Sequence, residues 1–280
     1  MSSRPGPLDR IEAYFAAAPV PDTTVERIGA LDVPIGPAEW PYPARPHPGV
    51  GPVPAVDVQA ALDRQAQAGL PASLEWFAGR NPGLAQTVRA AGLVVDELPL
   101  LVAVDPVEVT LPPEVRLYLV GADDPLLATY QRLAQLAFDN PGLAGAVAGA
   151  TALGDEASGR GAELPAPTAV LRERVAAGRT VMMIAVEHGE TVAVGSHQPV
   201  AVGGADGRVD DVSEVVGIAT MPRFRGRGLG AGLASALVEH ARETADLVFL
   251  TAGDDDVARV YERVGFAQVG TTLVGERPAG

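Results

Sequence analysis

The hydrophobic pattern is most regular in the last quarter of the chain. Apolar residues recur there at the 3.6-residue spacing of an amphipathic helix, and shorter apolar, β-branched runs between them are typical of strands. The expected helices cover residues 229–244 and 255–264, and the expected strands cover residues 212–220, 247–251 and 267–274. Because helices and strands alternate, we predict a mixed α/β unit here.

The preceding region carries a similar but less regular pattern. It predicts one strand, two helices and a hairpin around His188-Gly189-Glu190, with a glycine-rich turn at 203–207 leading to the next strand. The expected strand covers residues 115–120, the helices 125–138 and 169–177, and the hairpin strands 180–187 and 191–202. Residues 140–167 are rich in Gly and Ala with little periodicity, which favours a solvated loop, with a substrate lid as the alternative.

The turn between the strand at 212–220 and the helix at 229–244 has the sequence Arg225-Gly226-Arg227-Gly228-Leu229-Gly230. The first NH groups of a helix have no intrahelical partner and carry the positive end of the helix dipole. Glycines allow a phosphate to approach these NH groups, and arginines add charge-assisted hydrogen bonds. The turn therefore predicts an anion site for a ligand that carries a phosphate or pyrophosphate.

Composition excludes several other chemistries. All 21 basic residues are arginine, and the chain has no lysine and no cysteine. A P-loop lysine, a pyridoxal-phosphate anchor, a thiol nucleophile and a zinc thiolate site are therefore ruled out. The four histidines are scattered without the spacing of metal ligands, so we predict no metal site.

Length and charge set the broad class of protein. A chain of 280 residues, 47% of them hydrophobic, is expected to form two domains. The formal net charge of -14 argues against a nucleic-acid partner and is compatible with cationic substrates such as amines, although acidity also serves solubility alone. We find neither a signal-peptide pattern nor an apolar stretch of membrane-spanning length, and so expect a cytoplasmic monomer or homodimer with no membrane partner.

A second motif, Tyr261-Glu262-Arg263-Val264-Gly265-Phe266, follows the glycine turn. This motif, the positions of Arg225, Gly228 and Gly230, and the order of predicted elements together resemble the GNAT superfamily of acyl-CoA-dependent N-acetyltransferases over residues 115–274. The resemblance implies an α/β (α+β) fold with a mixed, mostly antiparallel central sheet flanked by helices. It also implies that acetyl-CoA donates an acetyl group to a primary amine of a small molecule or peptide, by direct attack of the amine.

The resemblance further implies which residues contact the cofactor. The turn would bind the pyrophosphate, and the end of the preceding strand would pair with the pantetheine amides. The implied positions are Ile218, Ala219, Thr220, Arg225, Gly226, Arg227, Gly228, Leu229, Gly230 and Ala231. Asp254 departs from the family pattern, in which many relatives carry Asn, and we expect it to cap the helix that begins at Asp255.

The resemblance implies that Tyr261 is the general acid that protonates the leaving thiolate, and the alternative is an aromatic residue that packs in the core. Alternation along the strand places Glu214 on one face with Ile218 and Thr220, where it could accept the proton of the amine. The alternative for Glu214 is a solvated residue at the start of the strand.

Three further candidates for the base are Asp210, Asp211 and His197. Two other functions remain open at this point. One is a non-catalytic acyl-CoA-binding sensor or interaction protein. The other is a dinucleotide-dependent oxidoreductase, because residues 226–231 also satisfy G-x-G-x-x-A, although too few residues follow for a complete Rossmann domain.

The first part of the chain can be aligned with the last part at an offset of 173 residues, through an internal duplication or through chance similarity between Ala-rich helices. Gly92-Leu93 then corresponds to Gly265-Phe266, and Leu74-Glu75-Trp76-Phe77 to Leu247-Val248-Phe249-Leu250. We interpret this as an internal duplication, with a degenerate GNAT-like domain at 1–110 and the catalytic domain at 111–280. The first copy has Val88 in place of Tyr261 and prolines in its turn at 47–52, so no cofactor site is expected there. The proline-containing residues 105–113 are predicted to be the linker.

Overall fold

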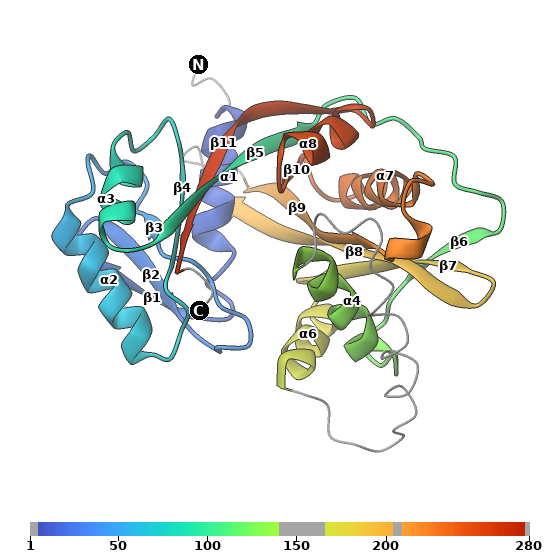
Figure 1. The fold of residues 1–280 in the computed structure, drawn as a ribbon, viewed down its shortest axis with the longest axis horizontal. Helices are drawn as coiled ribbons and strands as arrows, with labels where there is room; N and C mark the ends of the chain where they lie inside the picture. The colour runs from blue at the N-terminus through green and yellow to red at the C-terminus, as the bar shows by residue number, and fades with distance from the viewer. Residues whose placement is uncertain (1–4, 140–165, 204–208, 278–280) are drawn as a thin grey trace.

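The computed structural model describes residues 5–139, 166–203 and 209–277 (Figure 1). Its main feature is an eight-stranded sheet with the strand order β4-β11-β5-β10-β9-β8-β7-β6. Neighbouring strands run antiparallel except β9 and β10, which are parallel. The predicted mixed, mostly antiparallel sheet flanked by helices is thus confirmed.

The elements before residue 110 are α1 (Pro7–Ala17), β1 (Thr24–Ile28), β2 (Leu31–Ile35), β3 (Arg45–Pro46), α2 (Ala55–Gln67), β4 (Ser73–Phe77), α3 (Leu84–Ala90) and β5 (Val94–Ala103). Those after it are β6 (Val115–Leu119), α4 (Leu127–Asp139), α6 (Ala166–Ala176), β7 (Val181–Glu187), β8 (Glu190–Gly203), β9 (Val209–Thr220), the short 3₁₀ helix η2 (Pro222–Phe224), α7 (Leu229–Arg242), β10 (Leu247–Thr251), α8 (Asp255–Glu262) and β11 (Phe266–Glu276).

Helices cover both faces of the sheet (Figure 1). Alternate residues of β8 point to opposite faces. Ala193 belongs to a buried cluster with α7 and α8, whereas Val194 packs with α4 and α6 and Val202 packs with α1. One face of the sheet therefore carries α7 and α8, and the other carries α1, α4 and α6.

The two parts of the chain exchange strands. β5, from the first part, lies between β10 and β11, and β11 lies between β4 and β5. At the offset of 173, α2, β4, α3 and β5 correspond in order to α7, β10, α8 and β11. In the β5–β11 ladder, Leu98 pairs with Thr272 and Pro99 pairs with Thr271. At the offset of 173, Leu98 corresponds to Thr271 and Pro99 to Thr272, so the offset converts each pair into the other. A pseudo-twofold axis between the two strands requires this relation. This symmetry supports the duplication, while the division into domains near residue 110 stays a prediction.

The expected elements agree closely with the structure in the last part of the chain. β10 has the predicted bounds, and the hairpin turn at His188-Gly189 has positive φ at both residues (49° and 84°), as a type I′ turn requires. β11 is longer than predicted, because both of its edges are paired. The turn predicted at 203–207 and most of the loop predicted at 140–167 lie outside the described residues.

The predicted linker contains no helix or strand between 105 and 113, yet it packs against α7. The Ser235 hydroxyl donates to the carbonyl oxygen of Val107 (2.8 Å), and Arg242 donates to those of Ala103 (2.7 Å) and Val104 (3.0 Å), directly before the linker. Leu111 covers Gly232, where a Cβ atom would lie 2.4 Å from a Leu111 methyl carbon. The linker is therefore a docked segment of the fold.

Candidate active site

The parallel strands β9 and β10 separate at Glu214. Their pairing covers three positions and ends at Phe249↔Glu214. Beyond that position β9 continues to Thr220, whereas β10 stays paired with β5 as far as Thr251. The sheet therefore forks at the carboxyl ends of two parallel strands, a position at which α/β proteins commonly bind ligands.

A β-bulge lies on β9 just beyond the fork. Gly195 of β8 is opposed by two residues, Gly217 and Ile218, and Gly217 has a φ of +67°. A bulge of this kind reverses the alternation of side chains along a strand. Ile218 consequently packs with the α7 cluster, whereas Glu214 lies on the α1 side beside Tyr14. The prediction that Glu214 shares a face with Ile218 and Thr220 was therefore wrong.

The glycine turn joins β9 to α7. Gly226 and Gly228 both have a φ of +76°, a conformation that glycine adopts without strain. The Gly232 NH group makes an intrahelical bond to the Gly228 carbonyl oxygen (2.9 Å), so the NH groups of residues 229–231 belong to the first turn of the helix. This geometry is suited to an anion, and the cofactor contacts assigned to residues 218–220 and 225–231 stay predictions.

The two arginines of the turn bind protein groups in this structure. Arg225 Nε donates to the Thr220 carbonyl oxygen at 3.2 Å, which fixes the end of β9. Arg227 forms ion pairs with Glu187 (Nη1 to Oε2, 2.9 Å) and with Glu114 (3.1 Å). The Arg227 guanidinium lowers the pKa of the Glu187 carboxyl. A pyrophosphate would have to compete with these carboxylates for Arg227, which sequence reasoning did not foresee.

Tyr261 lies on α8, on the other side of the sheet from Glu214. Its ring meets that of Phe266 at a centroid distance of 5.8 Å and packs against the α7–α8 cluster. Burial raises the pKa of the Tyr261 phenol to about 12, so the phenol keeps its proton at neutral pH.

The prediction that Asp254 caps the helix beginning at Asp255 is confirmed, because Asp254 Oδ1 accepts a hydrogen bond from the Val257 NH at 2.7 Å.

Glu214 is surrounded by groups from the first part of the chain. Burial and the charge of Glu75 raise the pKa of the Glu214 carboxyl to about 8, while Arg45 and a hydrogen bond from Tyr14 act in the opposite direction. The Tyr14 hydroxyl also donates to the carbonyl oxygen of Gln198 at 3.2 Å. Sequence reasoning missed Tyr14, Arg45 and Glu75, and the one local signal was a glutamate inside the apolar run of β4.

The other candidates for the base are placed differently. His197 lies on the α7 side, buried between the Ser213 hydroxyl (2.8 Å from Nδ1) and His240 (3.0 Å from Nε2). Burial lowers the pKa of His197 to about 4, which suits a structural link between β8, β9 and α7. Asp211 lies near the start of β9, far along the strand from the glycine turn, and the side chain of Asp210 is outside the described part.

Two kinds of feature are absent from the described ranges. No cluster of three or more His, Asp or Glu side chains in residues 5–139, 166–203 and 209–277 has the arrangement of a metal site. In the same ranges, no helix combines the length and the apolar character needed to cross a bilayer.

Comparisons with known proteins agree with the overall fold. Among solved structures, a GCN5-related N-acetyltransferase from Kribbella flavida is similar over 99% of this chain and 98% of its own, with 23% identity and a TM-score of 0.67. A putative GNAT-family acetyltransferase from Novosphingobium aromaticivorans is similar over 97% of both chains, with 16% identity and a TM-score of 0.55. No curated protein matches the sequence. Residues 156–266 match the model of the Acetyltransferase (GNAT) family, so the chain contains a domain of that family.

Proposed function

We propose that the protein transfers an acetyl group from acetyl-CoA to a primary amine. The observation that carries this proposal is the glycine turn at the end of β9, directly beyond the fork between β9 and β10. An acyl-CoA bound there would place its pyrophosphate at the first turn of α7. Its pantetheine arm would run along residues 218–220 towards the fork, with the thioester near Glu214.

The reaction needs one bond made, one broken and two proton movements. The amine nitrogen attacks the thioester carbonyl carbon, and the C–S bond then breaks to release the CoA thiolate. Glu214, at the fork on the α1 side, is the proposed acceptor of the amine proton. Tyr261, on the α8 side, is the proposed donor to the leaving thiolate.

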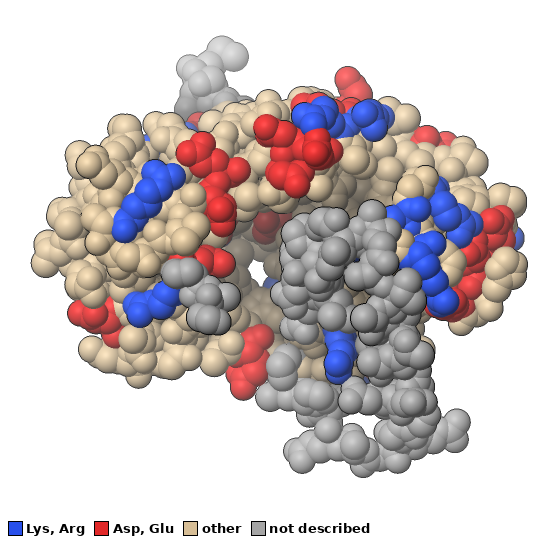
Figure 2. Space-filling view, viewed as in Figure 1, with Lys and Arg blue, Asp and Glu red and all other residues tan. Residues whose placement is uncertain are grey.

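The charge distribution on one face of the molecule favours a cationic acceptor. Figure 2 shows a hollow in the centre of one face of the molecule, with acidic side chains on several sides of its rim. Clefts lined by one sign of charge raise the local concentration of oppositely charged substrates. Together with the net charge of -14, this supports an amine that is protonated in solution.

A substitution at Gly228 tests the cofactor site. Gly228→Val is expected to raise the dissociation constant of acetyl-CoA at least about tenfold, or roughly 1.4 kcal/mol, because a branched side chain disfavours the φ of +76° and covers the helix NH groups. Gly69→Val is the matched control, since Gly69 has a φ of +70° and equally open surroundings but lies at the end of α2. Calorimetry that finds equal affinities in the two folded variants contradicts the site.

The pH dependence of turnover tests Glu214. A carboxylate accepts a proton only when ionised, so kcat/KM is expected to rise with pH through about 8, below the pKa of about 10.4 of an alkyl ammonium. Glu214→Gln should lower kcat/KM by about 100-fold or more and remove this rise. Asp211→Asn, on the same strand, is the control.

The pH dependence of folding stability tests the raised pKa of Glu214 independently of turnover. A carboxyl whose pKa is raised on folding contributes stability below its unfolded pKa, and this stability is lost as the pH rises through the folded value of about 8. Glu214→Gln should therefore gain stability relative to the wild type between pH 5 and pH 8.5. If Glu214→Gln has the same pH profile of turnover as the wild type, and also the same pH profile of stability, Glu214 is not the base.

A non-catalytic acyl-CoA sensor is the second candidate function. It is favoured by the ion pairs of Arg227 with Glu187 and Glu114, which an acyl-CoA would displace as a signal. An assay of CoA release with acetyl-CoA and a panel of amines separates the two. Binding without CoA release for every amine supports the sensor.

A further inference from the structure

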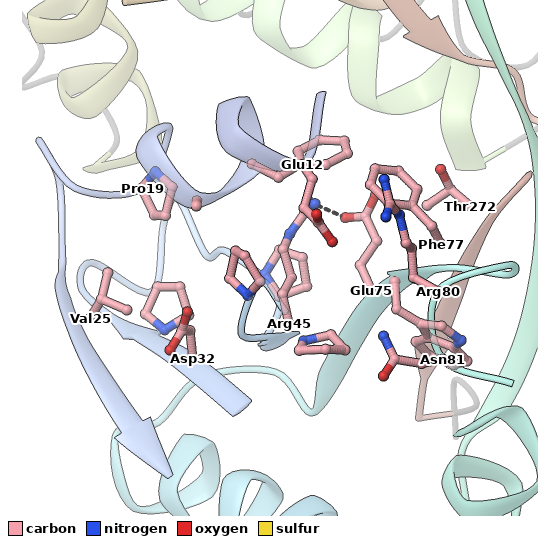
Figure 3. Close-up of a pocket in the computed structure, with 17 residues that line it drawn as sticks. Glu12, Pro19, Val25, Asp32, Arg45, Glu75, Phe77, Arg80, Asn81 and Thr272 are labelled. Carbon is pink, nitrogen blue, oxygen red and sulfur yellow. Dashed lines mark hydrogen bonds and ion pairs between the residues drawn. The ribbon is translucent and has the colours of Figure 1, made fainter. Parts of the chain in front are cut away.

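A pocket lies in the first part of the chain, between α1 and the strands β2, β3 and β4 (Figure 3). The empty space within it, together with the solvent-open space at its mouth, amounts to about 600 Å³. Thr272 of β11 is its one lining residue from the last part of the chain. The lining includes neither Glu214 nor Tyr261 nor any residue of the glycine turn, but Arg45 and Glu75 of the lining act on the Glu214 carboxyl, so the pocket adjoins the proposed acetyl-transfer site.

Charged side chains converge at the centre of the pocket. Figure 3 shows Glu12 of α1, Arg45 of β3 and Glu75 of β4 pointing towards one another. Arg45 forms an ion pair with Glu75, with side-chain exposures of 20% and 14%. Glu12 is half-buried and has no hydrogen-bond or ion-pair partner among the residues that the structure describes. Arg45 is thus paired with Glu75 and also acts on the Glu214 carboxyl of β9, and Glu12 has no counter-charge of its own among the described residues.

The pocket wall also holds two polar atoms in need of partners. Asn81 Oδ1 and Thr272 Oγ1 are both buried. Within the described residues, Asn81 Oδ1 accepts no hydrogen bond, and Thr272 Oγ1 neither donates nor accepts one. The exposed fraction is 8% for Asn81 and zero for Thr272. A buried polar atom without a partner lowers stability, and a ligand that hydrogen-bonds to it would recover that loss.

The remaining wall is apolar and aromatic. Phe15, Trp76 and Phe77 line the pocket together with five prolines. The Arg45 guanidinium already lies 3.5 Å from the centroid of the Phe15 ring, so one ring of this wall packs against a cation. Arg80, the other basic residue of the lining, is held by Asp9.

We propose that this pocket binds an organic cation, a small molecule that carries a protonated amine on an apolar body. The ammonium would neutralise Glu12 beside the Glu75–Arg45 pair and donate to an unpartnered oxygen of the wall, while the apolar body would contact the aromatic rings. An anionic ligand would instead face two carboxylates, and a neutral apolar ligand would bury Glu12 without a counter-charge. This inference goes beyond acetyl transfer, because binding of the cation in the pocket needs neither the glycine turn nor Tyr261.

Calorimetry with phenethylammonium, 2-phenylethanol and phenylacetate on the full chain tests the charge preference. Phenethylammonium should bind at least about tenfold more tightly than the neutral and anionic analogues, which have the same ring. Glu12→Gln should remove this preference, whereas Glu243→Gln, at the exposed end of α7, should keep it. Equal affinity for the three compounds, or an unchanged preference in Glu12→Gln, overturns the proposal.

Thr272→Val separates ligand binding from folding. Replacing a buried, unpartnered hydroxyl by a methyl group of the same shape should leave the melting temperature equal or raise it. The same change should weaken phenethylammonium binding several-fold, because the ligand loses a hydrogen-bond partner in the pocket wall. Lower stability together with unchanged affinity contradicts this role of Thr272.

Two further measurements distinguish an acceptor amine from a separate effector. Mass spectrometry of phenethylammonium after incubation with acetyl-CoA reports whether the bound amine is acetylated. Gly228→Val should leave the binding of phenethylammonium unchanged, because the pocket lacks residues of the glycine turn. The pocket and the proposed acetyl transfer can therefore fail separately, and loss of amine binding in Gly228→Val would show that the two sites are one.

Discussion

Residues 111–280 produced without residues 1–110 are expected not to form a stable domain. β11 pairs with β5 along ten positions and with β4 along five, so this truncation removes both of its neighbours. It also removes Leu100 and Leu101, which are completely buried on opposite faces of the sheet. Losing one such side chain costs about 2–5 kcal/mol, a large part of a total stability of about 5–15 kcal/mol.

The matched control is the full chain cut within the linker. A protease site placed between residues 105 and 113 leaves all strands present, so the nicked protein should stay associated and melt as one cooperative unit. Circular dichroism of the truncated, nicked and intact proteins makes the comparison. A truncated protein that melts within a few degrees of the intact chain would show that the strand exchange contributes little to stability.

The sequence predicted the local features of the candidate site. Glycine is favoured at 226 and 228 by their left-handed conformations, and an acidic residue at 254 by the NH groups at the start of α8. Both preferences act within a few residues, so they are visible in the sequence itself. The buried apolar run of β10 is local in the same sense, and its bounds were predicted correctly.

The features that were missed depend on distant parts of the chain. A single bulge at Gly217 reverses the facing of Ile218 relative to Glu214, and periodicity alone assumes that no bulge exists. The pairing of Arg227 with Glu187 joins a turn to a strand 40 residues away. The insertion of β5 between β10 and β11 is likewise non-local, although the offset of 173 already indicated that the two parts correspond.

The burial of Tyr261 defines which role it can perform. Burial raises the pKa of the phenol to about 12, whereas a free thiol has a pKa of about 8.5. Complete transfer of the phenol proton to a thiolate would therefore be uphill by more than three pK units, at about 1.4 kcal/mol for each unit. A hydrogen bond from the phenol to the developing thiolate needs no such transfer, and such a bond to a charged group contributes about 1.5–3 kcal/mol. We therefore expect Tyr261 to stabilise the leaving group mainly as a hydrogen-bond donor.

Tyr261→Phe is accordingly expected to lower kcat by about 100-fold while the dissociation constant of acetyl-CoA stays within about twofold. The ring contact with Phe266 is kept, so the melting temperature should hardly change. The loss should also be the same at every pH from 6 to 9, because a phenol with a pKa of about 12 does not titrate in that range. Steady-state kinetics with an identified acceptor, together with calorimetry and thermal melting, measure all three quantities. Unchanged kcat would make Tyr261 a packing residue of α8, and a loss that disappears at high pH would indicate that the phenol titrates and acts as a true acid.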